Sequence, residues 1–237
     1  MVYLIKIIIG ILIPLIGTTI GALFVFLVKS NITINIKKFI IGLASGVMLA
    51  ASIWSLIIPS INISNGNPIP TLIGFVGGML SLLIFDKKIN LEKVDMLNLS
   101  VVIHNIPEGF SVGVAIALAL SANNFIMTNA ILLSIGIGIQ NIPEGCIISL
   151  NSLTTKNKTK AFLDGFLSGI VEPIASILAM LLVIYITPIM PYLLSYAAGA
   201  MIFVCVNELI PNSNGSFGII GITIGFSIMM VLDVLLG

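Results

Sequence analysis

Long apolar runs make up most of the chain, and short polar breaks separate them. The runs cover roughly residues 3–28, 38–59, 68–85, 96–120, 125–150, 161–186, 191–211 and 215–236. A helix needs about 17 to 25 apolar residues to cross the roughly 30 Å hydrocarbon core of a bilayer, and each run is long enough to do so. No run alternates polar with apolar residues, so the pattern predicts membrane-spanning helices and not barrel strands.

The breaks between the runs consist of turn residues and are too short to form further domains. Asn65-Gly66-Asn67-Pro68 separates the second run from the third, for example. The first run is too long for the apolar region of a signal peptide and has no clear cleavage site, so we expect it to be retained as a helix. We therefore predict an all-α integral membrane protein with eight transmembrane helices in a single domain, residues 1–237.

Composition supports the same class. Apolar residues make up 58% of the chain and charged residues only 8%, with a mean hydropathy of +1.23. Soluble domains carry about 25% charged residues, so the lipid bilayer is the expected surrounding of this chain. The net charge of +1 provides no basic surface for nucleic acid.

The lysines predict the orientation of the helices. All ten basic residues are lysines, and nine of them flank the first, third and fifth loops: Lys29, Lys37, Lys38, Lys87, Lys88, Lys93, Lys156, Lys158 and Lys160. Because basic residues concentrate in cytoplasmic loops, these three loops are predicted to be cytoplasmic. Both termini are then extracytoplasmic.

Five acidic residues interrupt the apolar runs, namely Glu108, Glu144, Glu172, Glu208 and Asp233. No basic residue lies at the same depth to pair with them. A buried carboxylate costs several kcal/mol unless it is protonated or neutralised. A bound cation would remove that cost, although protonation or an interfacial position would also do so, above all for Asp233.

Two of these glutamates belong to a repeated segment. Residues 103–109 read Ile-His-Asn-Ile-Pro-Glu-Gly and residues 139–145 read Ile-Gln-Asn-Ile-Pro-Glu-Gly, identical at six of seven positions. The two predicted helices are consecutive and antiparallel, so the repeat is inverted, and ligand sites often form between inverted repeats. In each copy the polar residues stand three and four positions before the glutamate, which places them on one helical face.

The repeats and the next helix offer a set of metal ligands. The candidates are His104, Asn105, Glu108, Gln140, Asn141 and Glu144, with Glu172 beside a proline in the sixth predicted helix. Imidazole with carboxylate and amide oxygens, and no thiolate, suits Zn²⁺, Fe²⁺, Mn²⁺ or Cd²⁺. Hydrogen bonding between helices is the alternative role for these side chains, but it does not require two matched copies.

The paired segments resemble the signature of the ZIP (zinc/iron-regulated transporter-like) family, in which His or Gln, then Asn or Asp, precede Pro-Glu-Gly. Further segments are similar to that family: residues 44–49, 197–201, 208–211 and 225–233. The resemblance implies eight helices in a 3+2+3 arrangement with inverted repeats, and Gly46 and Met48 do align with Gly199 and Met201. It also implies uptake of a divalent metal, above all Zn²⁺, into the cytoplasm.

The resemblance further implies a binuclear centre between the fourth, fifth and sixth helices. One metal would bind His104, Glu108, Gln140 and Glu144, and the other would bind Asn105, Asn141 and Glu172, with both repeat glutamates bridging. Gln140, where many members have His, indicates the prokaryotic GufA-like branch and therefore the inner (plasma) membrane. The metal is then cargo and not a cofactor, and a homodimer would be consistent with the family.

Two other functions use buried carboxylates. An intramembrane metal-dependent hydrolase would activate water on the same metal, but the chain has a single histidine and no His-Glu-x-x-His motif. A proton or alkali-cation antiporter would leave His104 and the matched amides unexplained. A non-enzymatic metal transporter is therefore the preferred hypothesis.

Overall fold

The computed structural model describes residues 2–28, 33–89, 93–120 and 124–236. All regular elements within these ranges are helical. They are α1 (Val2–Leu27), α2 (Ile34–Ala51), η1 (Ser52–Ile57), α3 (Ile58–Ile63), α4 (Pro68–Ile89), α5 (Lys93–Leu120), α6 (Asn124–Ser152), α7 (Lys158–Leu181), α8 (Val183–Ile186), η2 (Thr187–Ile189), α9 (Met190–Val204), η3 (Cys205–Leu209), α10 (Ile210–Asn212) and α11 (Ser216–Leu236).

Eight helical segments in the described part of the chain are long and apolar enough to cross a membrane, which confirms the predicted class. The second segment joins α2, η1 and α3, and the seventh runs from α8 to α10. The largest difference in boundaries lies between the sixth and seventh segments, where the prediction placed one helix over 161–186 and the next over 191–211. The backbone breaks at Leu182 (φ −112°, ψ 22°), so α7 ends at Leu181 and the next segment begins at Val183.

The second and seventh segments share an irregularity. Each contains a π-helix, Ser52–Ile57 in one and Cys205–Leu209 in the other. Ser52 and Cys205 stand at the same offset as Gly46 and Gly199, which pair in the sequence alignment. A π-helical turn holds an extra residue and often occurs at functional sites. The two segments therefore carry the same local widening at matching positions.

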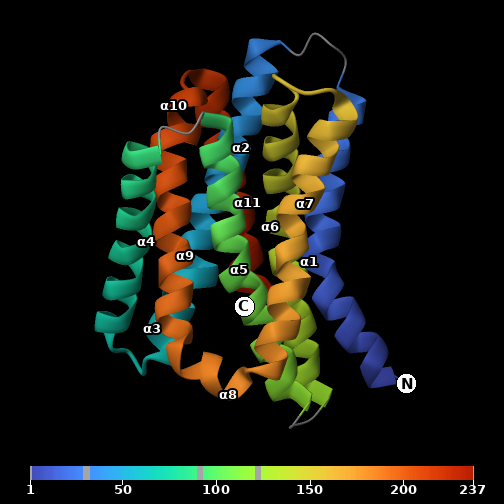
Figure 1. Ribbon diagram of the computed structural model, residues 1–237, viewed down its shortest axis with the longest axis vertical. Coiled ribbons are helices and arrows are strands. Elements are labelled where there is room, and N and C mark those ends of the chain that lie inside the picture. Colours follow the sequence, from blue (N-terminus) through green and yellow to red (C-terminus); the bar gives the residue numbers. More distant parts are fainter. Residues whose placement is uncertain (1, 29–32, 90–92, 121–123, 237) are drawn as a thin grey trace.

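The helices of the first half of the chain and those of the second half pack in corresponding pairs (Figure 1). Helix α1 packs on α6 and α7 packs on α5, while α2 packs on α11 and α9 packs on α4. An inverted repeat that relates the first three segments to the last three would produce these pairs. The 3+2+3 arrangement itself stays a prediction.

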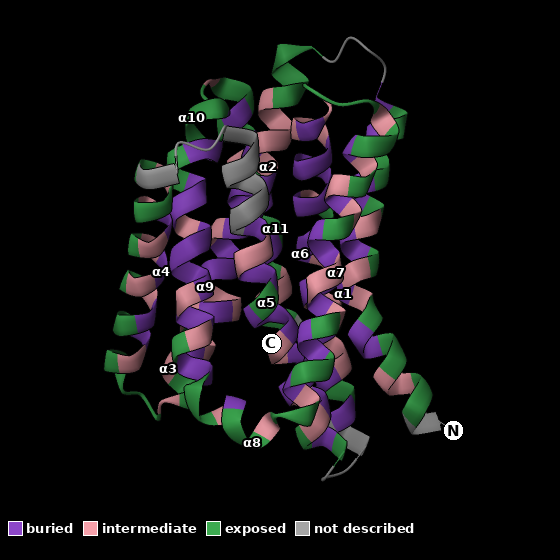
Figure 2. Ribbon diagram, viewed as in Figure 1, coloured by how far each residue is buried: buried purple, intermediate pink, exposed green. Residues whose placement is uncertain are grey.

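Burial increases toward the middle of the bundle (Figure 2). In the most apolar 18-residue stretch of the span that contains α9, 67% of the residues are buried. The share is 22% in the spans of α4 and α11. The outward faces carry exposed Leu, Ile, Val and Phe side chains, as lipid contact requires. At one end of the bundle Lys158, at the start of α7, donates to the carbonyl of Val28 after α1 (2.6 Å). The end of α1 and the start of α7, which both adjoin lysine-bearing loops, therefore lie side by side.

Candidate metal centre

Helices α5 and α6 carry the two repeat segments and pack against each other, and α7 packs against both. Pro107 and Pro143 lie inside these helices, which continue through the prolines. None of the seven predicted ligands exposes more than 1% of its surface: His104, Asn105, Glu108, Gln140, Asn141, Glu144 and Glu172. The structure thus gathers all seven in the interior of the bundle.

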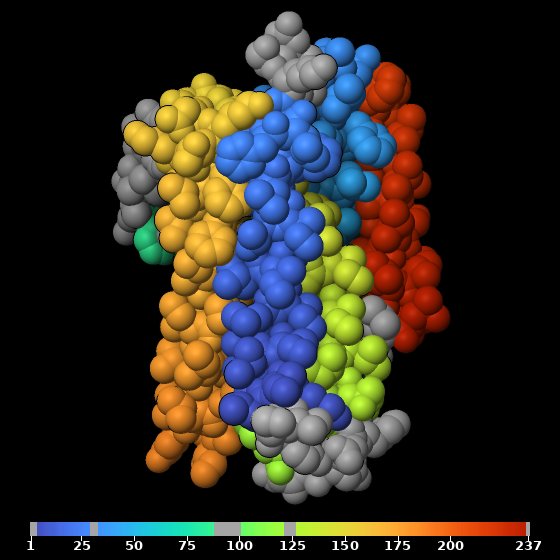
Figure 3. Space-filling model, turned by 90° about the vertical axis from the view of Figure 1, so that its right-hand side faces the viewer, coloured from blue at the N-terminus to red at the C-terminus, as the bar shows by residue number. Residues whose placement is uncertain are grey.

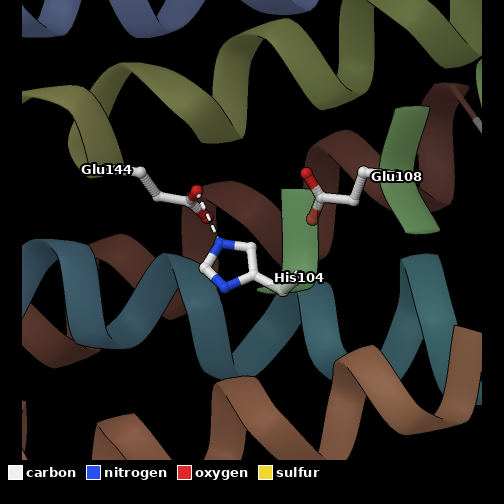
Figure 4. Close-up of side chains that lie close together, drawn as sticks. All are labelled: His104, Glu108 and Glu144. Carbon is white, nitrogen blue, oxygen red and sulfur yellow. Dashed lines mark hydrogen bonds and ion pairs between the residues drawn. The ribbon is translucent and has the colours of Figure 1, made fainter. Parts of the chain in front are cut away.

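Four of these residues form a first group between α5 and α6. His104 Nε2 lies 2.9 Å from Glu144 Oε2, and Gln140 Nε2 donates to Glu108 Oε1 at 2.8 Å. Figure 4 shows His104, Glu108 and Glu144 pointing toward one another from the two helices. One ligand atom from each of these three lies within 4.8 Å of the others, so the three could hold a single metal ion.

The other three residues form a second group that faces α7. Asn141 Nδ2 donates to Glu172 Oε2 at 2.7 Å, and Asn105 Nδ2 donates to the carbonyl of Ser168 at 2.9 Å. Each asparagine follows a first-group residue directly in sequence. A step of one residue turns about 100° around a helix, which directs the asparagines to the neighbouring helix.

Five oxygen atoms in the two groups have no hydrogen-bond donor among the described residues. They are Asn105 Oδ1, Glu108 Oε2, Gln140 Oε1, Asn141 Oδ1 and Glu144 Oε1. Each of the three amides donates its NH₂ group to a protein oxygen and leaves its own oxygen unpaired. Buried polar atoms without partners are rare in folded proteins and each requires an explanation. Cations bound within the two groups would satisfy these acceptor oxygens.

A cavity of about 290 Å³ lies near the centre on the side of the lysine-bearing loops. Its lining includes Lys37 of α2, Ile147 and Asn151 of α6, and Glu208 of η3. Ile147 follows Glu144 by three residues, so the cavity begins about one helical turn from the first group. Glu208, whose role the sequence left open, belongs to this cavity and to neither group.

Some polar contacts of the centre could not be predicted from the repeats. The hydroxyl of Thr18 on α1 lies 3.3 Å from Glu172 Oε1, and Ser168 on α7 accepts from Asn105. Asp233 of α11 belongs to neither group and accepts a hydrogen bond from Ser55 of η1 at 2.6 Å. In the sequence, each of these residues is visible only as a polar residue within an apolar run. Such a signal does not predict which helices pack against each other.

Comparisons with known proteins give relatives that are named as zinc transporters. Zinc transporter ZIP11 from Homo sapiens is 41% identical over 151 residues, which are 62% of this chain and 44% of that protein. Zinc transporter GufA from Myxococcus xanthus is 32% identical over 143 residues, 59% of this chain and 54% of that protein. Zinc transporter ZupT from Lysinibacillus sphaericus (strain C3-41) is 28% identical over 271 residues, which cover 93% of both chains.

The extent of these matches differs among the relatives. The chain spans less than half the length of the ZIP11 proteins that it matches, but nearly all of the ZupT protein. No family model matches the chain.

Proposed function

The chain belongs to the ZIP family, with relatives that include its GufA-like branch, and from this premise we propose that it carries Zn²⁺ across the membrane. Fe²⁺, Mn²⁺ and Cd²⁺ are alternative cargoes that the same ligands would accept. The observation that carries this proposal is the set of five buried oxygens without donors among the described residues of the two groups. Metal is cargo here, and no cofactor is required.

The two groups are proposed to bind two cations that share Glu108 and Glu144. Each glutamate has one oxygen bonded within the first group and one oxygen without a donor. A bridging carboxylate offers one oxygen to each cation, so the bonded oxygen would serve the first cation and the oxygen without a donor would serve the second. The first cation takes the place of the proton between His104 and Glu144, and the second is held by Asn105, Asn141 and Glu172.

Transfer between the two sites requires only a change of carboxylate coordination. A cation shared by bridging oxygens moves to the adjacent site without entering lipid, where the energetic cost would be prohibitive. The cavity beside Glu208 then offers a route to the lysine-bearing end. With that end in the cytoplasm and both termini outside, transport is inward across a prokaryotic inner membrane.

Relatives named as transporters favour this proposal over an intramembrane hydrolase. An alkali-cation antiporter would leave His104 unexplained, because hard cations prefer oxygen ligands alone. An antiporter of either kind would leave the matched amides of the two repeats unexplained. A homodimer stays a prediction, which the mass of the detergent-solubilised protein would test.

The decisive experiment is Zn²⁺ uptake into proteoliposomes that contain the purified full-length protein and an entrapped zinc-sensitive dye. We expect uptake that follows the zinc gradient and is absent from protein-free liposomes. Hydrolysis of a membrane substrate without uptake would support the hydrolase. Na⁺ or proton exchange without Zn²⁺ movement would support the antiporter.

A further inference from the structure

Thr18 of α1 lies at the edge of the second group, although α1 carries none of the proposed ligands. Its side chain is 1% exposed, and its hydroxyl oxygen lies 3.3 Å from Glu172 Oε1. The same hydroxyl lies 3.3 Å from the carbonyl oxygen of Pro14, one turn earlier in α1. That carbonyl also accepts a contact of 3.4 Å from Asn141 Nδ2. The first helix therefore contributes two oxygens to the polar surroundings of Glu172 and Asn141.

Two glycines allow α1 to come this close to the metal-bearing helices. A Cβ atom at Gly145 of α6 would lie 2.0 Å from the carbonyl oxygen of Thr18. A Cβ atom at Gly169 of α7 would lie 2.8 Å from Thr18 Cβ and 2.9 Å from its hydroxyl oxygen. Figure 3 shows α1 (blue) along the junction of α7 (orange) and α6 (yellow-green). Thr18 is thus held between the residue after Glu144 and a residue one turn before Glu172.

The two oxygens of Glu172 have different partners. Asn141 of α6 donates to Oε2 at 2.7 Å, and Thr18 of α1 is the contact of Oε1. A donor on only one oxygen would leave the carboxylate free to rotate about that bond. Contacts on both oxygens fix the plane of the carboxylate, and hydrogen bonds of this kind orient metal-binding carboxylates in many sites.

We propose that Thr18 is a positioning residue for Glu172 and thereby sets the affinity of the second cation. The proposal rests on the binuclear site proposed above. Thr18 contacts no residue of the first group through its hydroxyl, so the first cation should not respond to its loss. Partners that orient a metal ligand typically contribute about 10- to 100-fold to metal affinity. The long 3.3 Å contact places Thr18 at the lower end, about 10-fold.

The test is isothermal titration of Zn²⁺ into the purified full-length protein in detergent. Thr18→Val keeps the shape of the side chain against Gly169 and removes the hydroxyl. We expect one of two binding steps to weaken about 10-fold and the other to remain unchanged. Thr18→Ser, which keeps the hydroxyl, should retain both steps. Thr18→Ala provides a second variant without the hydroxyl if the valine protein does not fold.

Thr19→Val is the matched control, because the Thr19 hydroxyl donates within its own helix to Leu15 at 2.6 Å and does not contact Glu172. In a Glu172→Gln background, Thr18→Val should have no added effect. A Thr18→Val protein with wild-type binding would overturn the proposal, as would equal weakening of both steps or an undiminished loss in the Glu172→Gln background. Wild-type protein that binds two cations without transporting them would refute the proposed function and leave the role of Thr18 standing.

Discussion

Replacement of Glu108 by Gln tests the shared carboxylate directly. The change keeps the size of the side chain and removes a charge that we place next to both cations. A Glu108 oxygen lies within 4.8 Å of ligand atoms of His104 and Glu144. Unit charges about 4 Å apart attract by about 4 kcal/mol at an effective dielectric of about 20, and a divalent cation doubles this attraction. Even with most of it offset by desolvation, a remaining loss of about 3 kcal/mol lowers affinity about 100-fold.

Asn105→Ala is the comparison, because in the proposed scheme it affects only the second cation. The change removes one neutral ligand oxygen and the 2.9 Å hydrogen bond to the Ser168 carbonyl. A neutral hydrogen bond contributes about 1 kcal/mol, so the expected loss is below about 10-fold. Glu108→Gln should therefore nearly abolish transport, and Asn105→Ala should leave a measurable flux.

The assay is the initial rate of Zn²⁺ uptake at equal amounts of reconstituted protein. Asp164→Asn serves as the control, because that carboxylate pairs with Lys156 at 2.6 Å on the surface and should not affect uptake. The reasoning would be refuted if Glu108→Gln retained most of the uptake while Asn105→Ala abolished it. The cation would then pass by a route that the Pro-Glu-Gly repeats do not line.

Gln140→His should raise the preference for Zn²⁺ over Mn²⁺ in competition uptake, because imidazole is the better zinc ligand, and an unchanged preference would remove Gln140 from the ligand set. Single cysteines at Thr155 and at Asn65 should be labelled only from the cytoplasm and only from outside, respectively; the reverse would invert the orientation. Gly145→Ala, whose Cβ would lie 2.0 Å from a backbone oxygen, should lower the free energy of unfolding in detergent by about 1–3 kcal/mol, whereas Gly136→Ala, with nothing within 4 Å, should not.

The sequence predicted the eight spans and the seven buried candidate ligands, because both depend on strong local signals. The length of an apolar run predicts a membrane-spanning helix. A charged or amide side chain inside such a run is easily recognised in the sequence. The break at Leu182 was missed for the same reason. Leu182 is apolar like its neighbours, so hydropathy continues across a point where the backbone turns.

The π-helices and the contact of Thr18 depend on information that a local pattern does not contain. A π-helical turn contains more residues than an α-helical turn, but the residues are no less apolar. In hydropathy, Ser52–Ile57 therefore resembles the α-helix around it. Thr18 is a single hydroxyl in an apolar run without a matching copy. Its proximity to Glu172 depends on how closely α1 approaches two other helices, and that distance follows from packing between segments far apart in sequence.

If the proposed cations bind at the five buried oxygens without donors, the lifetime of the protein also depends on its cargo. Empty, the folded chain bears the cost of keeping these acceptors away from water, a cost that the unfolded chain avoids. A cation that occupies them binds the folded state alone, and at a concentration 100 times its dissociation constant it adds about 2.7 kcal/mol to the stability of that state. If the proposed cations bind there, metal starvation would leave this protein more open to unfolding and proteolysis.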